Sequence, residues 1–538
     1  MPEERLKFFS PVDRLAYAAF FLIFIGAFLF VRPFGEFPLI DDWVHSLTIH
    51  SYLADGDFFY SPLLASFLHV PILYGIGLGK LFGFSFFLLR LSNLILGFFT
   101  VIIFYRFLRH LKNPPPASFL LSLLLWFNPI FFSLSHTFMS DVPALFFLVT
   151  ALFFYHRGFK ENNNWFIFFA SSLTVFGFYT RQFVGLLLFI AAGYWLWQNR
   201  HGWRPAIWLF GLPIAILFGV YGGLSYFNLL PLSIGAVILP SALSVWQHYL
   251  LNFWGHGLFI SLFLLPVSFS VMVNNRQWLK DKVLILLLLI SLAITAILHF
   301  NHHTFLDLGS IINWWGLGPS FGFLQGQINA WGGRNVYLII NFILGAALPF
   351  NIFLAAKTFK TIEKNQVTAW IFLVFGELYF LFILPLSSFD RYLLLLLPSL
   401  LIFAGFILQH CRWSKTVFTI FLIPFLFYSL IGTYNYLAWN QARWTAADRL
   451  VKEKNIAAHR IDAGVEWDGW ALGASEKNQF YSGRSPEWTP WYIQTIFRGQ
   501  PMDYIVAFSE IPGYNVIDRQ KVNGLMSNID YLYVNQKP

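Results

Sequence analysis

The sequence predicts a polytopic all-α membrane protein with about 13 transmembrane helices, followed by a small C-terminal soluble α/β domain. Only 11% of the 538 residues are charged, whereas soluble proteins carry about 25%. Hydrophobic residues make up 57% and aromatic residues 20%, which excludes a disordered chain. The third observation is a series of apolar runs that are long enough to cross a bilayer.

Each predicted span is an apolar run close to the roughly 20 residues that the hydrocarbon core requires. The predicted spans are residues 15–32, 86–107, 117–135, 142–156, 164–180, 182–198, 205–226, 257–273, 283–299, 336–356, 367–385, 391–409 and 416–437. The run 62–83 is also apolar, but prolines and glycines interrupt it. We therefore expect interfacial or re-entrant helices within a first outer loop, 33–85.

Basic residues predict the orientation of these spans. With the N-terminus in the cytoplasm, the inner segments hold 18 Lys and Arg residues, and the outer side of the membrane region holds six. This bias agrees with the positive-inside rule, and it accounts for the net charge of +9 without nucleic-acid binding. No Asn-x-Ser or Asn-x-Thr sequence is present, so we expect a bacterial plasma membrane. A single cysteine, Cys411, excludes an intramolecular disulfide.

The last hundred residues differ in composition from the rest. Residues 440–538 hold 11 basic and 11 acidic residues and no long apolar run. We expect an amphipathic helix at 441–457 and strands at 503–509 and 531–535. With the N-terminus in the cytoplasm, 13 spans place this part on the outer side of the membrane. The predicted organisation is a membrane region, 1–439, and an extracytoplasmic soluble domain, 440–538.

Acidic residues on the predicted outer side mark the candidate site. Ionisable groups at membrane level are costly and usually functional, and the longest loops, 33–85, 227–256 and 300–335, lie on the same side. The outer acids are Glu36, Asp41, Asp42, Asp55, Asp57, Asp141, Asp307 and Asp390. We therefore expect the active face to be external.

Asp41 and Asp42 are adjacent carboxylates at the start of this first outer loop. Adjacent carboxylates repel, which raises the pKa of one of them and suits a general base that takes a proton from a hydroxyl acceptor. The alternative is that Asp42 caps a helix at 43–53. Asp141, at the outer entry to the fourth span, is either a further catalytic acid or a helix cap.

Arg181 and Arg391 are the candidate cations. Arg181 lies in the tight turn between the fifth and sixth spans, and its alternative role is contact with lipid headgroups. Arg391 either pairs with Asp390 on the surface or faces outward to bind phosphate, because a guanidinium matches phosphate geometry. Outer histidines could hold a divalent metal, but their spacing is not diagnostic and packing roles are the alternative: His45, His50, His136, His248, His256, and His302 and His303 with Asp307.

The order of these motifs resembles the GT-C glycosyltransferases, in the branch of protein O-mannosyltransferases and bacterial lipid A aminoarabinose transferases. The resemblance covers residues 1 to about 440 and is densest in 35–185. The segments that carry it are Asp41-Asp42, Gly56–Leu63, Leu81–Ser85, Leu89–Asn93, Ser140–Pro143, Thr180–Gln182 and Asp390–Tyr392, with Pro398.

The resemblance implies an inverting glycosyltransferase that takes a sugar from a polyprenyl-phosphate donor. The acceptor, a lipid, glycan or protein, would approach from the outer side. It implies that Asp41, with Asp42 beside it, provides the catalytic carboxylate, and that Asp141 is a second site acid. Many relatives carry a Lys or His before Pro-Pro-Leu in the first loop, where this chain has Tyr60-Ser61-Pro62-Leu63. The phosphate role then passes to Arg391 or Arg181, with Arg334 or a divalent metal as possible help.

Three other classes of protein remain as alternatives. A secondary transporter would show an internal repeat and broken midplane helices, and no repeat is evident. An enzyme like the O-antigen ligases or polymerases would depend on an outer loop rich in Arg and His, and 300–335 holds few of them. A membrane scaffold would leave Asp41, Asp42 and Asp141 without a role. The glycosyltransferase hypothesis requires Asp41, Asp141, Arg181 and Arg391 to meet in one chamber beside a hydrophobic groove.

Overall fold

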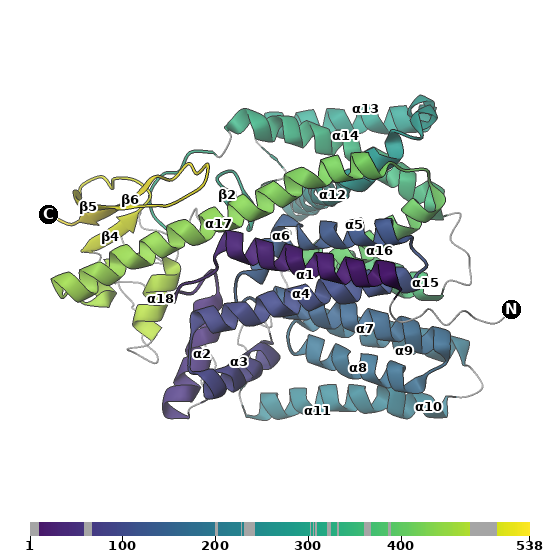
Figure 1. Cartoon of the computed structure of the whole chain (residues 1–538), viewed down its shortest axis with the longest axis horizontal. Helices are drawn as coiled ribbons and strands as arrows, with labels where there is room; N and C mark the ends of the chain where they lie inside the picture. The colour runs from purple at the N-terminus through teal and green to yellow at the C-terminus, as the bar shows by residue number, and fades with distance from the viewer. Residues whose placement is uncertain are drawn as a thin grey trace.

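The chain folds into a bundle of helices with a small β-sheet at one end. The computed structural model describes residues 10–56, 58, 67–199, 203–227, 229–230, 243–301, 303–304, 306, 309–319, 324–330, 333–359, 367–385, 389–473 and 503–538. Most helices of the membrane region run along the long axis of the molecule, with the N-terminus at one end and the sheet at the other (Figure 1).

One helix, or two or three consecutive helical segments, occupies each predicted span. The single helices are α1 (Pro11–Val31), α4 (Phe86–His110), α7 (Asp141–Glu161), α8 (Asn164–Phe178), α12 (Leu243–Met272), α13 (Lys282–Phe300), α14 (Arg334–Phe359), α15 (Val367–Ile383) and α17 (Lys415–Lys454). The composite ones are α5 (Pro115–Trp126) with α6 (Pro129–Ser135), η1 (Gln182–Gly185) with α9 (Leu186–Gln198), α10 (Arg204–Ala206) with η2 (Ile207–Gly211) and α11 (Leu212–Tyr226), and η5 (Asp390–Leu395) with α16 (Leu397–His410). Two short 3₁₀ turns are η3 (Arg276–Lys280) and η6 (Ala458–Arg460).

The number of transmembrane helices stays a prediction. Within the described residues, eight helices are long and apolar enough to cross a membrane, or nine if α5 and α6 form one span. Four more apolar segments are 10–17 residues long. The break between α5 and α6 bends the chain by 61°. It falls at Asn128, whose side chain accepts the Ile130 and Phe131 N–H groups, and at Pro129, which cannot continue a helix from the preceding turn.

The predicted first outer loop contains two helices at the end of the bundle nearest the sheet (Figure 1). They are α2 (Asp42–Asp55) and α3 (His69–Phe82). Two glycines let them approach closely. A Cβ added at Gly75 would lie 2.5 Å from the Ile49 side chain, and one at Gly79 would lie 2.3 Å from Leu53. The glycines that interrupt the apolar run therefore form the contact between these helices.

The C-terminal part contains a four-stranded sheet in the order β3-β4-β6-β5. β3 (Ile461–Asp462) is parallel to β4 (Tyr504–Ala507), whereas β6 (Tyr531–Gln536) is antiparallel to β4 and to β5 (Asn515–Lys521). The two predicted strands correspond to β4 and β6, while β3, β5 and α18 (Val465–Gly473) were not predicted. A short hairpin, β1 (Ile312–Asn313) and β2 (Gly316–Leu317), packs on α17.

One prediction about secondary structure was wrong. A span at 416–437 and a separate helix at 441–457 were expected, but α17 is a single helix of 40 residues. It runs through the predicted domain boundary at 439/440 without interruption. Asn440 and Arg443, which follow that boundary, are buried within the fold and bonded to neighbouring groups of α17. The membrane region and the sheet are therefore connected by a continuous helix.

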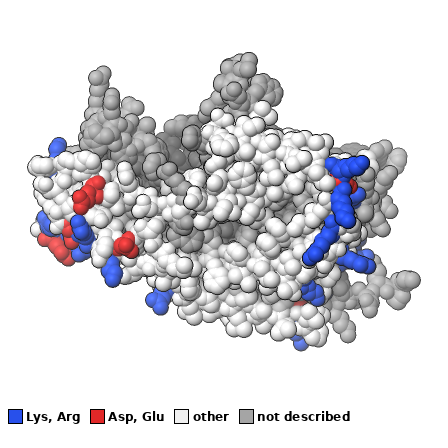
Figure 2. All heavy atoms as spheres, turned by 90° about the horizontal axis from the view of Figure 1, so that it is seen from above, with Lys and Arg blue, Asp and Glu red and all other residues white. Residues whose placement is uncertain are grey.

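Charged side chains gather at the two ends of the molecule. Figure 2 shows Lys and Arg concentrated at the end opposite the sheet, both signs of charge near the sheet, and a broad band between them with few charges. In the chain, α4 and α7 finish with basic residues and α17 begins with Lys415. The face seen in Figure 2 thus has a band with few charges and a basic rim at the end opposite the sheet.

Candidate active site

Asp41 and Arg391 meet although 350 residues separate them in the sequence. Asp41 immediately precedes α2, and Arg391 is the second residue of η5. Nη1 of Arg391 donates to Oδ2 of Asp41 at 3.2 Å. The Asp41 side chain is 43% exposed and that of Arg391 is 14% exposed. Nε–H of Arg391 is buried and has no partner among the described residues, so the guanidinium retains an unused donor.

Asp141 and Arg181 form a second ion pair close by. Nη2 of Arg181 donates to Oδ2 of Asp141 at 2.9 Å, and its Nε donates to Oγ of Ser140 at 3.2 Å. Asp141 is buried at the start of α7, and Arg181 precedes η1. Arg181 therefore points inward to a carboxylate rather than outward to lipid headgroups.

The ring of Tyr392 lies between the two pairs. The guanidinium carbons of Arg181 and Arg391 are 5.7 Å and 5.9 Å from the ring centroid, which is cation–π range. The Tyr392 carbonyl accepts the Tyr379 hydroxyl at 2.6 Å. The two guanidinium groups, each paired with a carboxylate from another segment, thus lie near the ring of Tyr392. We call Asp41, Asp141, Arg181 and Arg391 the charge cluster. The structure brings these four side chains close together, while a shared chamber beside a hydrophobic groove stays a prediction.

Asp42 lies inside the fold, unlike its neighbour Asp41. It is 2% exposed, and its Oδ2 accepts the Phe138 N–H at 2.9 Å and the Leu39 N–H at 3.4 Å. Burial raises the pKa of Asp42 to about 8, and repulsion from Asp41 adds to this rise. One carboxylate of the pair does have a raised pKa, but the main cause is desolvation. Asp42 ties the first loop to the turn before Asp141.

His45 was expected to be a packed or interfacial histidine, and it lies beside the charge cluster. It is one helical turn after Asp41, and its Nδ1 is 3.2 Å from the Phe138 carbonyl. Burial lowers the pKa of His45, although Asp41 and Asp141 are close enough to oppose this. Burial therefore favours the neutral imidazole. A spacing of four residues from Asp41 on a helix was the signal in the sequence that could have identified it.

Two further outer charges fix the backbone of the first loop. The buried Arg90 guanidinium donates to the Pro33 and Phe37 carbonyls, both at 2.8 Å. Glu36 accepts the Ser85 hydroxyl at 2.7 Å and the Phe86 N–H at 2.8 Å, where α4 begins. The bonds of Arg90 pair buried polar groups, and together with those of Glu36 they hold the segment that leads to Asp41.

Asp390 does not form a surface pair with Arg391. It is fully buried, and its carboxylate accepts the N–H groups of Ser310, Ile311 and Ile312 at 3.0, 3.0 and 2.7 Å. A carboxylate that accepts several backbone N–H groups is a strong anchor. Asp390 therefore attaches the β1–β2 hairpin next to the charge cluster.

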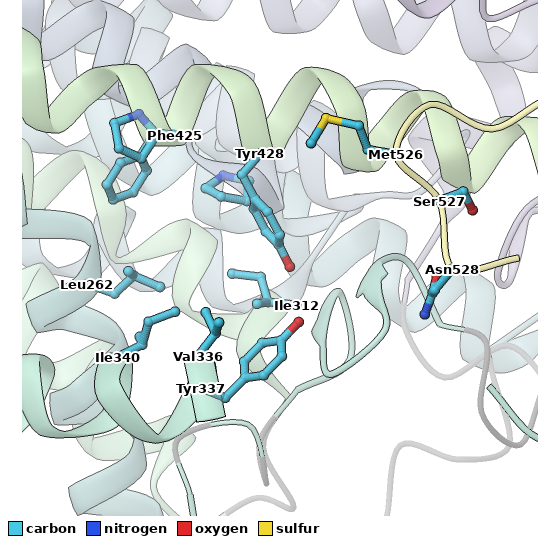
Figure 3. Close-up of a pocket in the computed structure, with 12 residues that line it drawn as sticks. Leu262, Ile312, Val336, Tyr337, Ile340, Phe425, Tyr428, Met526, Ser527 and Asn528 are labelled. Carbon is cyan, nitrogen blue, oxygen red and sulfur yellow. The ribbon is translucent and has the colours of Figure 1, made fainter. Parts of the chain in front are cut away.

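An apolar cavity of about 570 Å³ lies behind this hairpin (Figure 3). Residues of α6, α12, α14, α17 and the loop between β5 and β6 line it, and Ile312 of β1 contributes to its wall: Pro129, Leu262, Ile312, Val336, Tyr337, Ile340, Pro424, Phe425, Tyr428, Met526, Ser527 and Asn528. The Tyr337 hydroxyl donates to the Trp314 carbonyl at 2.7 Å. Asp390 binds the Ile312 N–H and is also the residue before Arg391. The cavity wall and Arg391 are therefore linked through Asp390.

Some candidate residues lie outside what the structure describes. They are the side chains of Arg334, at the start of α14, and of His248, and the residues Asp57, Tyr60–Leu63, His302 and Asp307. His50 packs against Phe84 and Trp470, and the Nδ1 atoms of His136 and His256 contact carbonyls of their own helical turns. In the described ranges, no group of three or more His, Cys, Asp or Glu side chains could hold a metal ion.

Comparisons with known proteins bear on this site. Two solved structures are similar: ArnT from Cupriavidus metallidurans bound to undecaprenyl phosphate, with 13% identity, a TM-score of 0.43, and coverage of 85% of this chain and 74% of that chain; and apo ArnT, with 13% identity, a TM-score of 0.37, and coverage of 85% and 84%. A search of curated proteins found no match. Residues 73–221 match the sequence profile of the dolichyl-phosphate-mannose-protein mannosyltransferase family. This match includes Asp141 and Arg181, and the resemblance to GT-C glycosyltransferases is confirmed over that part of the chain.

Proposed function

We propose that the protein is an inverting glycosyltransferase that moves a sugar from a polyprenyl-phosphate donor to a hydroxyl acceptor at the outer face of the membrane. The observation that carries this proposal is the proximity of two ion pairs, Asp41–Arg391 and Asp141–Arg181, whose guanidinium groups both lie near the ring of Tyr392. A carboxylate and two guanidinium groups are what such a reaction needs in one place.

Asp41 is the general base in this proposal. It is the accessible carboxylate of the cluster, while Asp141 and Asp42 are each 2% exposed. The acceptor oxygen attacks the anomeric carbon and its proton passes to Asp41, while the bond from that carbon to the phosphate oxygen breaks. A single displacement of this kind inverts the anomeric centre.

Arg391 and Arg181 would hold the departing phosphate. Guanidinium groups bind phosphate through paired N–H donors, and charge that develops on the leaving oxygen is stabilised by donors already in place. Arg391 pairs with Asp41, so binding of the donor would release Asp41 to act as a base. Asp141 keeps Arg181 oriented.

The apolar cavity provides a place for the isoprenoid chain. Transfer of such a chain out of an apolar environment costs about 0.8 kcal/mol per methylene, so the donor must stay in contact with apolar surface while its phosphate reaches Arg391. The wall at Ile312 and the anchor at Asp390 bring the cavity to the residue next to Arg391. A tail in this cavity would place the phosphate near the charge cluster.

The distribution of charge supports the proposed location. The basic rim opposite the sheet is consistent with a cytoplasmic face in a bacterial plasma membrane (Figure 2). The charge cluster would then lie at the extracytoplasmic side, with residues 440–538 beside it. Identification of the product would show which sugar is transferred and whether the acceptor is a lipid, a glycan or a protein.

The test combines a product search with a binding measurement. Mass spectrometry of cell-envelope glycolipids and glycoproteins, with and without the gene, should show one sugar modification that disappears and returns only with active protein. Purified protein should bind undecaprenyl phosphate, and Arg391→Ala should weaken that binding. An unchanged envelope together with no binding of undecaprenyl phosphate would refute the proposal.

A further inference from the structure

The backbone immediately before Asp41 is strained. Ile40 has a φ of +57°, which is a genuine outlier for a β-branched residue. The Asp42 N–H donates to the Leu39 carbonyl at 3.0 Å and closes a tight turn over Ile40 and Asp41. Turns with a positive φ at the first central position normally carry glycine, Asn or Asp there. Such strain persists only where the surroundings impose it, and it concentrates at active sites.

The group that holds this turn comes from the C-terminal part of the chain. Oε1 of Glu466, in the first turn of α18, accepts the Ile40 N–H at 3.1 Å. The other carboxylate oxygen accepts Nη1 of Arg443 at 2.8 Å, and both side chains are 0% exposed. Nη2 of Arg443 donates to Oδ1 of Asn440 at 2.6 Å. A buried network from α17 and α18 thus reaches the residue before the proposed base.

α18 is also fixed against the helix that follows Asp41. A Cβ at Gly469 would lie 2.6 Å from ring atoms of Trp43, so only glycine allows this approach. Trp470 stacks on Phe84, with ring centroids 5.8 Å apart and an interplanar angle of 10°. In Figure 1, α18 extends from the region of α17 towards α2. The C-terminal part therefore contacts the chain on both sides of Asp41.

We propose that Glu466, held by Arg443, is a positioning residue for Asp41. It keeps Ile40 at a positive φ and so directs the Asp41 carboxylate towards Arg391. Without this acceptor, the turn would relax to a negative φ and displace the carboxylate. The inference rests on the proposed role of Asp41 as the base, and it gives residues 440–473 a part in the reaction without requiring them to touch a substrate.

The experiment compares two variants that differ in one hydrogen-bond acceptor. Both carry Arg443→Met, because an unpaired arginine in this buried position would destabilise the fold, whereas replacing a whole buried ion pair is often neutral. Combined with Glu466→Gln, an amide oxygen remains for the Ile40 N–H. Combined with Glu466→Leu, no acceptor remains. Each variant is made with and without Ile40→Gly in the full chain.

We expect the Leu variant to transfer sugar about 10- to 100-fold more slowly than the Gln variant, since a displacement of about 1 Å can cost that much. The rate is the formation of the envelope product per amount of inserted protein. Ile40→Gly should restore most of the rate of the Leu variant, because glycine adopts a positive φ without support. A merely structural role for Glu466 predicts no such rescue.

Hydrogen exchange of the amides of residues 39–42 separates this inference from the proposed function. Exchange in purified protein should be faster in the Leu variant than in the Gln variant, whatever reaction the protein catalyses. If the exchange differs but even the wild type forms no product, the turn is held as inferred and the transferase proposal is wrong. Equal exchange in the two variants, or a Leu variant that Ile40→Gly does not rescue, would overturn the inference.

Discussion

The two ion pairs of the charge cluster differ in the burial of their carboxylates. Asp41 is 43% exposed and contacts Arg391 through one bond of 3.2 Å, whereas Asp141 is 2% exposed and binds Arg181 at 2.9 Å. An exposed ion pair contributes little to stability and opens easily, while a buried one is costly to break. The Asp41–Arg391 pair is therefore suited to open when a substrate binds. The Asp141–Arg181 pair is suited to hold Arg181 in place.

The largest effect is expected from the exposed pair. Asp41→Asn should lower sugar transfer by about 10²–10⁴-fold, the usual contribution of a general base. The melting temperature should change little, because the side chain is accessible to water. Product formation in membranes, normalised to inserted protein, measures the first, and a thermal melt in detergent the second. Full transfer by correctly inserted Asp41→Asn protein would exclude Asp41 as the general base.

Removing the charge of Asp141 in the buried pair should lower both the stability of the protein and its binding of the donor lipid. Asp141→Asn leaves Arg181 without its counter-charge in a mostly buried position, so we expect a loss of about 1–3 kcal/mol of stability and weaker binding of undecaprenyl phosphate. Denaturation and lipid binding are measured on the same preparation. Asn keeps the shape of Asp, which makes it the matched partner of Asp41→Asn. If both variants lost only activity, the contrast between the pairs would be invalid.

Arg391 distinguishes binding of the donor from binding of the acceptor. Arg391→Ala should weaken binding of undecaprenyl phosphate by roughly tenfold or more, as expected for a charge-assisted bond. Arg391→Lys should recover part of this loss, because Lys keeps the charge but not the paired donors. Isothermal titration with undecaprenyl phosphate measures both. Unchanged affinity in the Ala variant would exclude Arg391 from the phosphate site.

The smallest expected effect concerns Asp42, the third carboxylate. Its pKa of about 8 in the folded protein lies above the usual value of about 4, so the folded state binds more protons between these values. Stability should therefore fall as the pH rises through this window. Asp42→Asn mimics the protonated acid and should melt several degrees above the wild type at pH 8, and close to it at pH 5. Parallel pH profiles would contradict the burial of an ionisable Asp42.

Hydropathy and charge made much of this molecule predictable. Each span predicted from an apolar run coincides with one helix or with two or three consecutive helical segments, because the length and hydropathy that a span needs are local properties of the sequence. Loop position brought Asp41, Asp141, Arg181 and Arg391 forward as candidates, although their roles stay predictions. The continuity of α17 was missed because its polarity changes near Asn440, where burial in the C-terminal part replaces burial in lipid.

Tertiary contacts account for the rest. Nothing near Glu466 in the sequence indicates that it binds the backbone at Ile40, since 426 residues separate them. The positive φ of Ile40 could not be foreseen either, because isoleucine favours the opposite conformation. His45 was assigned to a packed or interfacial role because its spacing from the other histidines and acids is not diagnostic of a metal site, and only the fold placed it near two carboxylates.

The unbroken α17 has a consequence for how the sequence can vary. At about 1.5 Å per residue, its 40 residues extend about 60 Å, roughly twice the hydrocarbon thickness. The sheet therefore packs against the far end of one continuous helix. Adding or deleting one residue within α17 would rotate the part of the helix that follows it by about 100°. α18 would then face away from the loop that it now supports.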